Sequence, residues 1–248
     1  MTAAAFSESI DRRVLGGFVF VDSITGEHVA APLAVTSKTL RLRANGRGVY
    51  AIFDAPGLSQ YTTQFDPPAT GWPAAQRFEV TVRDPSLKYI ARRAEVQAPQ
   101  SLAAVSTPQP VNLYAGPSAA LGPNWAVVRA SVTGSAGNGL PWAVLQVIRS
   151  DNSVAATGMT DARGEAVLAV TGLGVQVSAS ASGAVTETTI PVTVKAWFDP
   201  SVLAQPAGWI PNPDDILGNL SNASLKSGQQ TGALGAGQIL SAAITIAA

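Results

Sequence analysis

Few residues in this sequence have the types and spacing that catalysis requires. His28 is the only histidine, and there is no cysteine to act as a thiol nucleophile. To serve as a general base, His28 would need a serine and an aspartate from distant parts of the chain. As an exposed residue beside the Thr25-Gly26 turn it needs no partner. The sequence therefore disfavours a hydrolase and predicts no catalytic residue.

Acidic residues are the other candidates, and structural roles explain them better. Asp214 and Asp215 are adjacent, so on a helix their carboxylates point in different directions, and they suit a helix start rather than acid–base catalysis. Asp151, Asn152 and Asp161 could offer oxygen atoms to calcium, but they lack the spacing of an EF-hand loop and suit polar turns. We therefore expect neither a bound metal nor a cofactor.

The composition is that of a globular protein with little charge. Of the 248 residues, 46% are hydrophobic and 13% charged, and sixteen basic residues balance sixteen acidic ones. No net field would draw such a chain to nucleic acid or to an anionic membrane. The absence of cysteine excludes disulfides and zinc-thiolate sites, so we expect packing alone to stabilise the fold.

The two ends of the chain show no targeting pattern. Residues 1–13 carry acids where a secretory signal would have an apolar core, so we expect a loosely held arm and synthesis in the cytoplasm. The longest nearly continuous apolar run, residues 239–248, is well below the ~18 residues that cross a bilayer. No membrane span is expected.

Arginines on predicted strands are candidates for binding a partner. The alternation in residues 40–43 puts leucines on one face and Arg41 and Arg43 on the other, which is typical of a half-exposed strand. With Arg47, Arg92 and Arg93 they would form a basic patch if their strands are neighbours. Such a patch would suit an acidic subunit, or would be no more than a solvated sheet face.

The five tryptophans suggest a different surface, because sugars stack on exposed aromatic rings. They are Trp72, Trp125, Trp142, Trp197 and Trp209. Two of them, Trp125 and Trp142, flank predicted strand starts, where packing in a core is commoner. A carbohydrate- or cell-surface-binding module is therefore the alternative function.

Two similar turns organise the chain. The polar turn 160–164 runs directly into the apolar residues 165–170, which predicts a hairpin exit into a core strand. An Arg-Gly turn at residues 47–48 leads into a similar run 116 residues earlier. We therefore predict an all-β fold of two antiparallel β-sandwich modules, residues 14–99 and 124–197. The proline-rich residues 100–123 would link them.

The C-terminal residues 198–248 have a different composition. A short helix is expected at residues 214–220, and residues 221–237 read as a flexible lead to a final apolar strip. This extended C-terminal arm could add a strand to a neighbour's open sheet edge, or the strip could pair within its own domain. The strip residues that would contact a partner are Ile239, Leu240, Ile244 and Ile246.

The first module resembles a known family. Its Gly-led strand at residues 17–22, the Thr25-Gly26 turn, Pro32-Leu33 and residues 47–50 resemble the carboxypeptidase-regulatory-like module. Residues 128–170 resemble it more loosely. The resemblance implies a transthyretin- or Ig-like sandwich for both modules.

A combination of shorter motifs is similar to proteins that accompany phage-tail-like contractile injection particles. The motifs are Asp84-Pro85, Tyr89, Arg92-Arg93, Leu113-Tyr114, residues 125–128 and residues 160–166. The resemblance implies a non-enzymatic structural or adaptor component at the cap or collar end, oligomeric within the particle. Its partners would be sheath, tube, terminator or cap proteins, bound by protein–protein contacts and strand addition.

Overall fold

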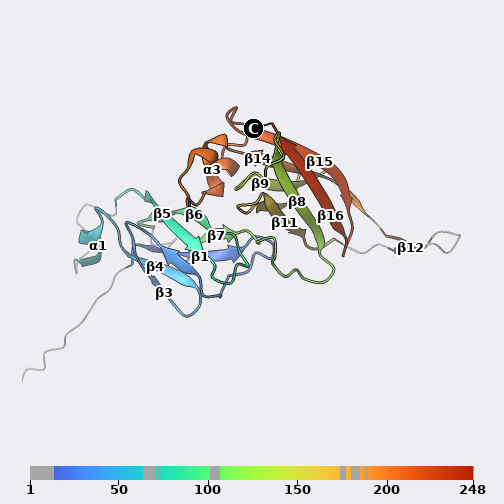
Figure 1. The fold of residues 1–248 in the computed structure, drawn as a ribbon. Helices are drawn as coiled ribbons and strands as arrows, with labels where there is room; N and C mark the ends of the chain where they lie inside the picture. Colours follow the sequence, from blue (N-terminus) through green and yellow to red (C-terminus); the bar gives the residue numbers. More distant parts are fainter. Residues whose placement is uncertain are drawn as a thin grey trace, which may run out of the picture. The chain divides into compact units, whose positions relative to one another are not determined.

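The computed structural model describes residues 14–63, 71, 73–100, 107–173, 177–179, 185–187 and 189–247. In this part of the chain the helical elements are short, namely α1 (Ser59–Thr63), the 3-10 helix η1 (Pro200–Ala204) and α3 (Pro213–Leu217). Strands make up most of the regular structure (Figure 1), which confirms the predicted all-β sandwich class.

The strands of the N-terminal half form two sheets. They are β1 (Gly16–Asp22), β2 (Ala34–Thr36), β3 (Arg41–Ala44), β4 (Val49–Asp54), β5 (Gln76–Arg83), β6 (Arg92–Ala98) and β7 (Gln109–Leu113). One sheet has the order β3-β4-β1-β7 and the other β2-β5-β6. Every residue of β1 is buried, as its β-branched and aromatic run predicts.

The strands of the C-terminal half form a second sandwich. They are β8 (Ala126–Gly134), β9 (Val144–Arg149), β10 (Val154–Met159), β11 (Glu165–Val170), β14 (Ile190–Phe198), β15 (Lys226–Leu234) and β16 (Ile239–Ile246), with the separate pair β12 (Val177–Ala179) and β13 (Val185–Glu187). The sheet β10-β9-β14-β15 faces the sheet β11-β8-β16. Val128, Leu145 and Val194, all fully buried, belong to their shared core.

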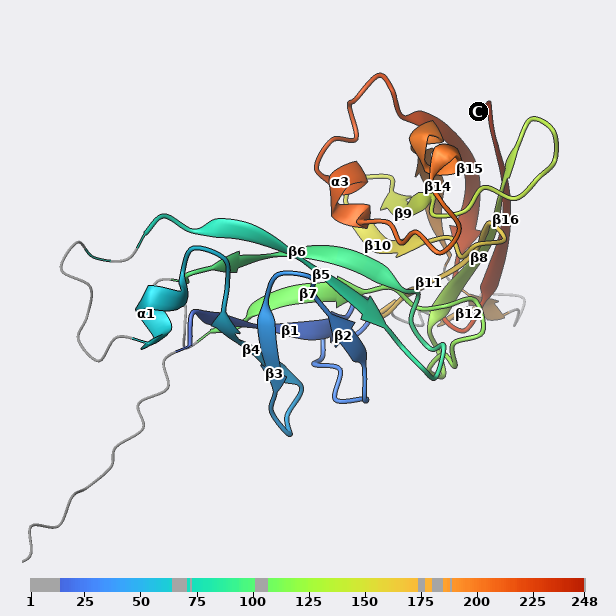
Figure 2. The same cartoon turned by 60° about the vertical axis from the view of Figure 1, so that its left-hand side comes forward.

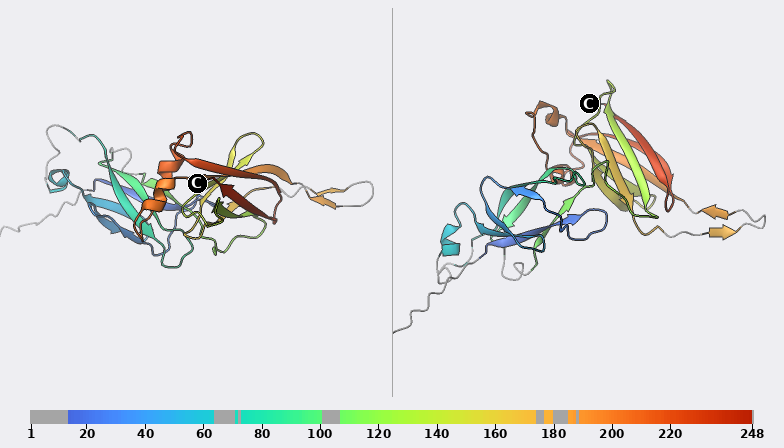
Figure 3. Two further views of the ribbon diagram at one scale, coloured as in Figure 1. Left: turned by 45° about the horizontal axis from the view of Figure 1, so that its top comes forward. Right: turned by 60° about the horizontal axis from the view of Figure 1, so that its bottom comes forward.

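The extended C-terminal arm is wrong, and the alternative that the strip pairs within its own domain is confirmed, because residues 226–246 complete this sandwich. β15 pairs with β14 along nine residues, and β16 pairs in parallel with β8 from Ile239 to Ile246. Figure 3 shows β16 lying along β8. The glycines that suggested a flexible lead are needed for close packing: a Cβ at Gly228 would lie 2.6 Å from the Thr245 carbonyl oxygen. At Gly232 it would meet the Leu240 side chain at 2.8 Å.

The compact units of the chain do not follow the boundaries expected at residues 100–123. One unit comprises residues 1–19, 36–80 and 95–110, and the other holds the rest. Strand β7 lies within the expected linker, as an end strand of its sheet. Its Pro110 is tolerated there because an edge strand has backbone positions that need no hydrogen-bond donor.

The two Arg-Gly turns have different roles. The turn before Gly48 closes a hairpin between β3 and β4, and the Asn45 side chain accepts hydrogen bonds from the Arg47 and Val49 backbone N–H groups at 2.9 Å each. The turn before Gly164 is not a hairpin, because β11 pairs with β8 rather than with β10. It carries the chain from one sheet of the sandwich to the other.

Candidate binding sites

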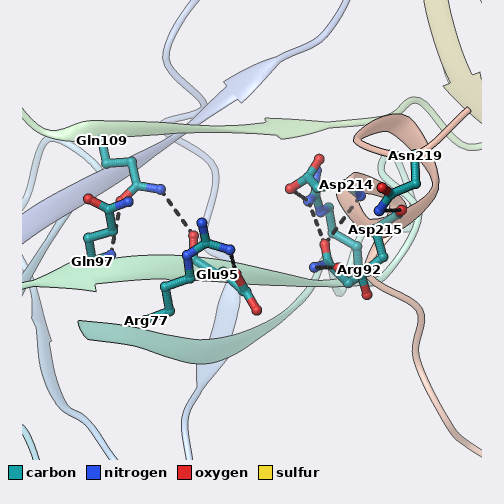
Figure 4. A network of polar contacts seen from close by, with 9 residues as sticks. Arg77, Arg92, Glu95, Gln97, Gln109, Asp214, Asp215 and Asn219 are labelled. Carbon is teal, nitrogen blue, oxygen red and sulfur yellow. Dashed lines mark hydrogen bonds and ion pairs between the residues drawn. The ribbon is translucent and has the colours of Figure 1, made fainter. Parts of the chain in front are cut away.

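A buried arginine anchors the segment that follows η1. Arg92 on β6 is fully buried, and its guanidinium donates to the Asn112 carbonyl oxygen at 2.6 Å, to the Asn212 side chain at 3.3 Å and to the Asp214 carboxylate. Its Nε also donates to the Arg93 carbonyl oxygen at 3.0 Å. Figure 4 shows Arg92 pointing toward Asp214 at the start of α3.

The neighbouring arginine holds the same segment from a different side. The Arg93 Nε donates to the Ile210 carbonyl oxygen at 2.6 Å, and its guanidinium lies 4.9 Å from the centre of the Trp209 ring. The backbone N–H of Arg93 donates to the Pro211 carbonyl oxygen at 2.7 Å. Arg92 and Arg93 are therefore structural, and the prediction that they belong to a surface patch is wrong.

The remaining arginines of the predicted patch are exposed. Arg41, Arg43 and Arg47 lie on the β3–β4 hairpin, and Lys38 precedes it. Among the described residues none of the four has an acidic side chain within ion-pairing distance. We call Lys38, Arg41, Arg43 and Arg47 the cationic hairpin.

The apolar residues of the C-terminal strip point in two directions. Ile244 and Ile246 are 2% and 0% exposed and belong to the core of the second sandwich. Leu240 is half-buried against that core, and Ile239 is 63% exposed. The inward residues are therefore not available to a neighbouring subunit.

A cleft of about 230 Å³ lies among three loop segments that are far apart in the sequence. They are the turn at residues 22–31, the pair Lys88-Tyr89, and residues 115–125. A single network of hydrogen bonds fixes its polar side. Asp22 accepts from the Ile24 backbone N–H at 2.8 Å and from the Tyr89 hydroxyl at 2.7 Å.

The surroundings of Tyr89 keep its hydroxyl protonated. Burial, together with its hydrogen bond to Asp22, raises the pKa of Tyr89 well above its usual value. The Lys88 ammonium lies 3.7 Å from the Asp22 carboxylate and 4.8 Å from the centre of the Tyr89 ring. His28 lines this cleft as an exposed residue, and its backbone bridges to Val21.

The acidic candidates have the structural roles predicted for them. Asp214 and Asp215 occupy the first turn of α3, where Asn212 caps the helix. Asp151 accepts from the Ser153 backbone N–H and hydroxyl, and Asp161 from the Arg163 and Glu165 backbone N–H groups. Within the described ranges no group of three His, Cys, Asp or Glu side chains is placed to hold a metal ion.

The tryptophans do not form one platform. Trp197 is 6% exposed, Trp209 lies against Arg93, and Trp142 packs against the core of the second sandwich. Trp125 lines the cleft. Trp72 lies outside the described residues.

Comparisons with known proteins place the chain in no family. No protein-family model and no curated protein matches it, so the two resemblances stay predictions. Three of the solved structures that align with this chain each cover 94% of it. The Bacillus anthracis TIE protein is 11% identical with a TM-score of 0.26, and this chain spans 34% of its length.

The other two structures are pilins. The shaft pilin spaA from Lactobacillus rhamnosus GG is 9% identical over 97% of that chain, with a TM-score of 0.27. BcpA, the major pilin subunit of Bacillus cereus, is 10% identical over 55% of that chain, with a TM-score of 0.24. Values this low establish neither a shared family nor a shared role. Among the described residues no helix is long and apolar enough to cross a membrane.

Proposed function

We propose that this protein is a non-enzymatic structural subunit of a larger assembly and that the cationic hairpin binds an acidic surface of a neighbouring subunit. The observation that supports this most directly is the concentration of charge. Four of the sixteen basic residues fall within residues 38–47, and the sequence has no acid between Glu27 and Asp54. All four side chains are exposed.

The position of the charges favours side-chain contacts over strand addition. β3 is the end strand of the sheet β3-β4-β1-β7. Charged side chains on an edge strand oppose pairing with another chain. An acidic partner would remove the mutual repulsion of the arginines and gain ion pairs that weaken with salt. The binding surface is therefore the exposed arginine face.

The assembly that fits the sequence motifs is a phage-tail-like contractile injection particle, built in the cytoplasm. The support for this identity is the resemblance described above, which includes Asp84-Pro85 and Leu113-Tyr114. Sheath, tube, terminator or cap proteins are then the candidate neighbours. The cap or collar end is the expected location, and the protein would be oligomeric there.

Sedimentation of particles from the native source tests this proposal. The wild-type protein should sediment with large particles, and Arg41→Glu/Arg43→Glu should move at least about tenfold more of it to the soluble fraction. Arg163→Glu/Lys226→Glu makes the same charge change on the second sandwich and should sediment like the wild type. Equal sedimentation of both variants would refute the binding role of the cationic hairpin. Wild-type protein that never sediments with particles would refute the proposal that the protein belongs to a larger assembly.

The second candidate function is carbohydrate binding. The tryptophans as a set do not favour this function, because Trp197 is buried and Trp209 is covered by Arg93. One observation does: Trp125 lines a cleft together with hydroxyl and charged side chains. A glycan array probed with the folded protein is the first test of this function.

A further inference from the structure

The cleft has an apolar wall that belongs to a defined cluster. Ile24, Leu121 and Trp125 are partly buried and pack against Ala115, Ala119, Val127 and Val167. The last two come from β8 and β11, so the wall is supported by the second sandwich. Residues on regular strands hold such a wall more precisely than a loop alone would.

The indole of Trp125 is held in place and keeps a free donor. A Cβ at Gly122 would lie 2.6 Å from the Trp125 Cε2 and 2.9 Å from its Nε1, so the ring lies directly on the backbone there. Among the described residues the Trp125 Nε1 has no hydrogen-bond acceptor, and it is not one of the buried polar atoms without a partner. The N–H group is therefore accessible to a ligand.

The rest of the lining forms a polar wall that is only partly occupied by internal bonds. Asp22 is fully used, since it accepts from Ile24, Thr25 and Tyr89 and lies near Lys88. The Tyr89 oxygen can still accept a hydrogen bond, because a phenol both donates and accepts. Glu27 is exposed at the rim and adds one carboxylate that has no cationic partner among the described side chains.

Size and charge limit what the cleft can hold. Sites for drug-sized ligands occupy roughly 300–1,000 Å³, so a cleft of about 230 Å³ suits a smaller molecule, about one sugar ring. Because Lys88 offsets Asp22, Glu27 leaves the walls with a negative excess. An acidic ligand would be repelled by it, whereas a neutral ligand would not.

We propose that this cleft binds a neutral pyranose, with the C–H face of the sugar against Trp125 and its hydroxyl groups toward Glu27, Lys88 and Tyr89. A pyranose has one apolar face and a polar edge, which matches the two walls. An apolar peptide side chain would leave the polar wall without partners. This site does not depend on the cationic hairpin, so either proposal can fail alone.

Saturation-transfer NMR and calorimetry on the full chain test the site. The probes are the methyl glycosides of glucose, galactose and N-acetylglucosamine, with glucuronate as the acidic comparison. At least one neutral glycoside should bind with a Kd of order 1 mM and shift the Trp125 indole N–H resonance. Glucuronate should bind about tenfold more weakly, and Glu27→Gln should reduce that difference.

Matched variants separate binding from folding. Trp125→Ala should weaken binding at least about tenfold, whereas Trp209→Ala, outside the cleft, should not change it. If Trp125→Ala does not fold, the indole shift in the wild type decides the question. The proposal is overturned if no neutral glycoside binds below about 10 mM, if the Trp125 resonance stays unmoved, or if an apolar tripeptide binds instead.

Discussion

Strands β3 and β16 are both end strands of their sheets, and both carry residues that the sequence predicted to bind a partner. In β16 the alternate residues Ala242, Ile244 and Ile246 are buried in the core of the second sandwich. In β3 Leu42 is half-buried, and the arginines on the other face are exposed. Alternation thus separates the two faces of an edge strand, but it does not say whether the apolar face meets its own module.

The two edges are also protected in different ways. β3 has arginines, which oppose the approach of another strand. The free edge of β16 is covered by a side chain of β15: the Gln230 Oε1 accepts from the Ala243 backbone N–H at 2.7 Å, and its Nε2 donates to the Ser241 carbonyl oxygen at 3.4 Å. The edge of β16 is therefore closed by its own module, whereas the exposed arginines of β3 remain available for ion pairs with another subunit.

The largest predicted effect tests whether β16 is part of the second sandwich. Removing residues 239–248 deletes the buried side chains of Ala242, Ile244 and Ile246 and leaves β8 unpaired on one side. The burial of each of the two isoleucines contributes roughly 1.5–3 kcal/mol to stability. Near-UV circular dichroism and urea unfolding should show that the second sandwich no longer folds cooperatively. The exposed Ile239→Ser should be close to wild type, and a truncated chain with an unchanged urea midpoint would contradict the assignment.

The next effect compares a buried arginine with an exposed one. Arg92→Ala should destabilise the protein by about 2–5 kcal/mol, because it removes the donor to the Asn112 carbonyl and to Asp214 and leaves a cavity. Arg43→Ala should lie within about 0.5 kcal/mol of the wild type. Figure 2 shows α3, which Arg92 anchors, beside β9. Equal urea midpoints for the two variants would refute the distinction.

Local features of the fold could be predicted from the sequence. The period-two alternation of residues 78–83 predicts that Phe78, Val80 and Val82 face inward. Val80 and Val82 of β5 are buried, and Phe78 is half-buried. The two adjacent acids Asp214 and Asp215 indicated the start of α3, which begins at Pro213 and ends at Leu217, three residues before the expected end. Each of these depends on neighbours within a few residues. Strand order depends on contacts over long distances, so the Arg-Gly turn before Gly164 suggested a hairpin that does not form.

The misassigned residues still carried a signal. Arg92 shares its strand face with Ala94, Val96 and Ala98, all buried, so alternation alone placed it inward. Its acceptor Asp214 lies 122 residues away and could not be inferred from that pattern. Gly228 and Gly232 are four residues apart, which puts them on one face of a strand. Two glycines at that spacing are as typical of close packing against a neighbouring strand as they are of a flexible segment.

The cleft could not be predicted as a site, because three separate segments form it. The sequence associated Trp125 with packing beside a strand start, and its packing against the cluster that contains Val127 of β8 and Val167 of β11 agrees with that. Nothing local connects it to Tyr89 or Glu27. His28, the only histidine, drew attention for its chemistry, whereas its position on the cleft follows from the backbone bridge to Val21.

A smaller effect compares two carboxylates that have the same local motif and different burial. Asp84 and Asp151 each accept from the backbone N–H and hydroxyl of a serine two residues later. Burial of Asp84 acts to raise its pKa, but its hydrogen bonds from Ser86 and Tyr89 outweigh this and hold the pKa below the usual value. Asp84→Asn should therefore cost about 1–3 kcal/mol at neutral pH, and Asp151→Asn clearly less.

The stability difference between the wild type and Asp84→Asn should depend on pH. A carboxylate whose folded pKa is lowered stabilises the protein above its unfolded pKa of about 3.9, and the contribution is lost as pH falls through the folded pKa. Urea titrations from neutral to acid pH should therefore show the wild type converging on Asp84→Asn below that range. A difference that is constant with pH would mean that the carboxylate charge has no part in it.

The smallest effect tests how the edge of β16 is closed. Gln230→Ala removes two side-chain hydrogen bonds to the backbone of β16, which are exposed and worth at most about 1 kcal/mol together. Its more informative consequence is that the Ala243 N–H and Ser241 carbonyl become open to another strand. Analytical ultracentrifugation should show added self-association for Gln230→Ala, whereas Gln229→Ala, the neighbouring residue of β15, should match the wild type. A monomeric Gln230→Ala at every concentration would mean that the small residues of β16, rather than Gln230, keep this edge unpaired.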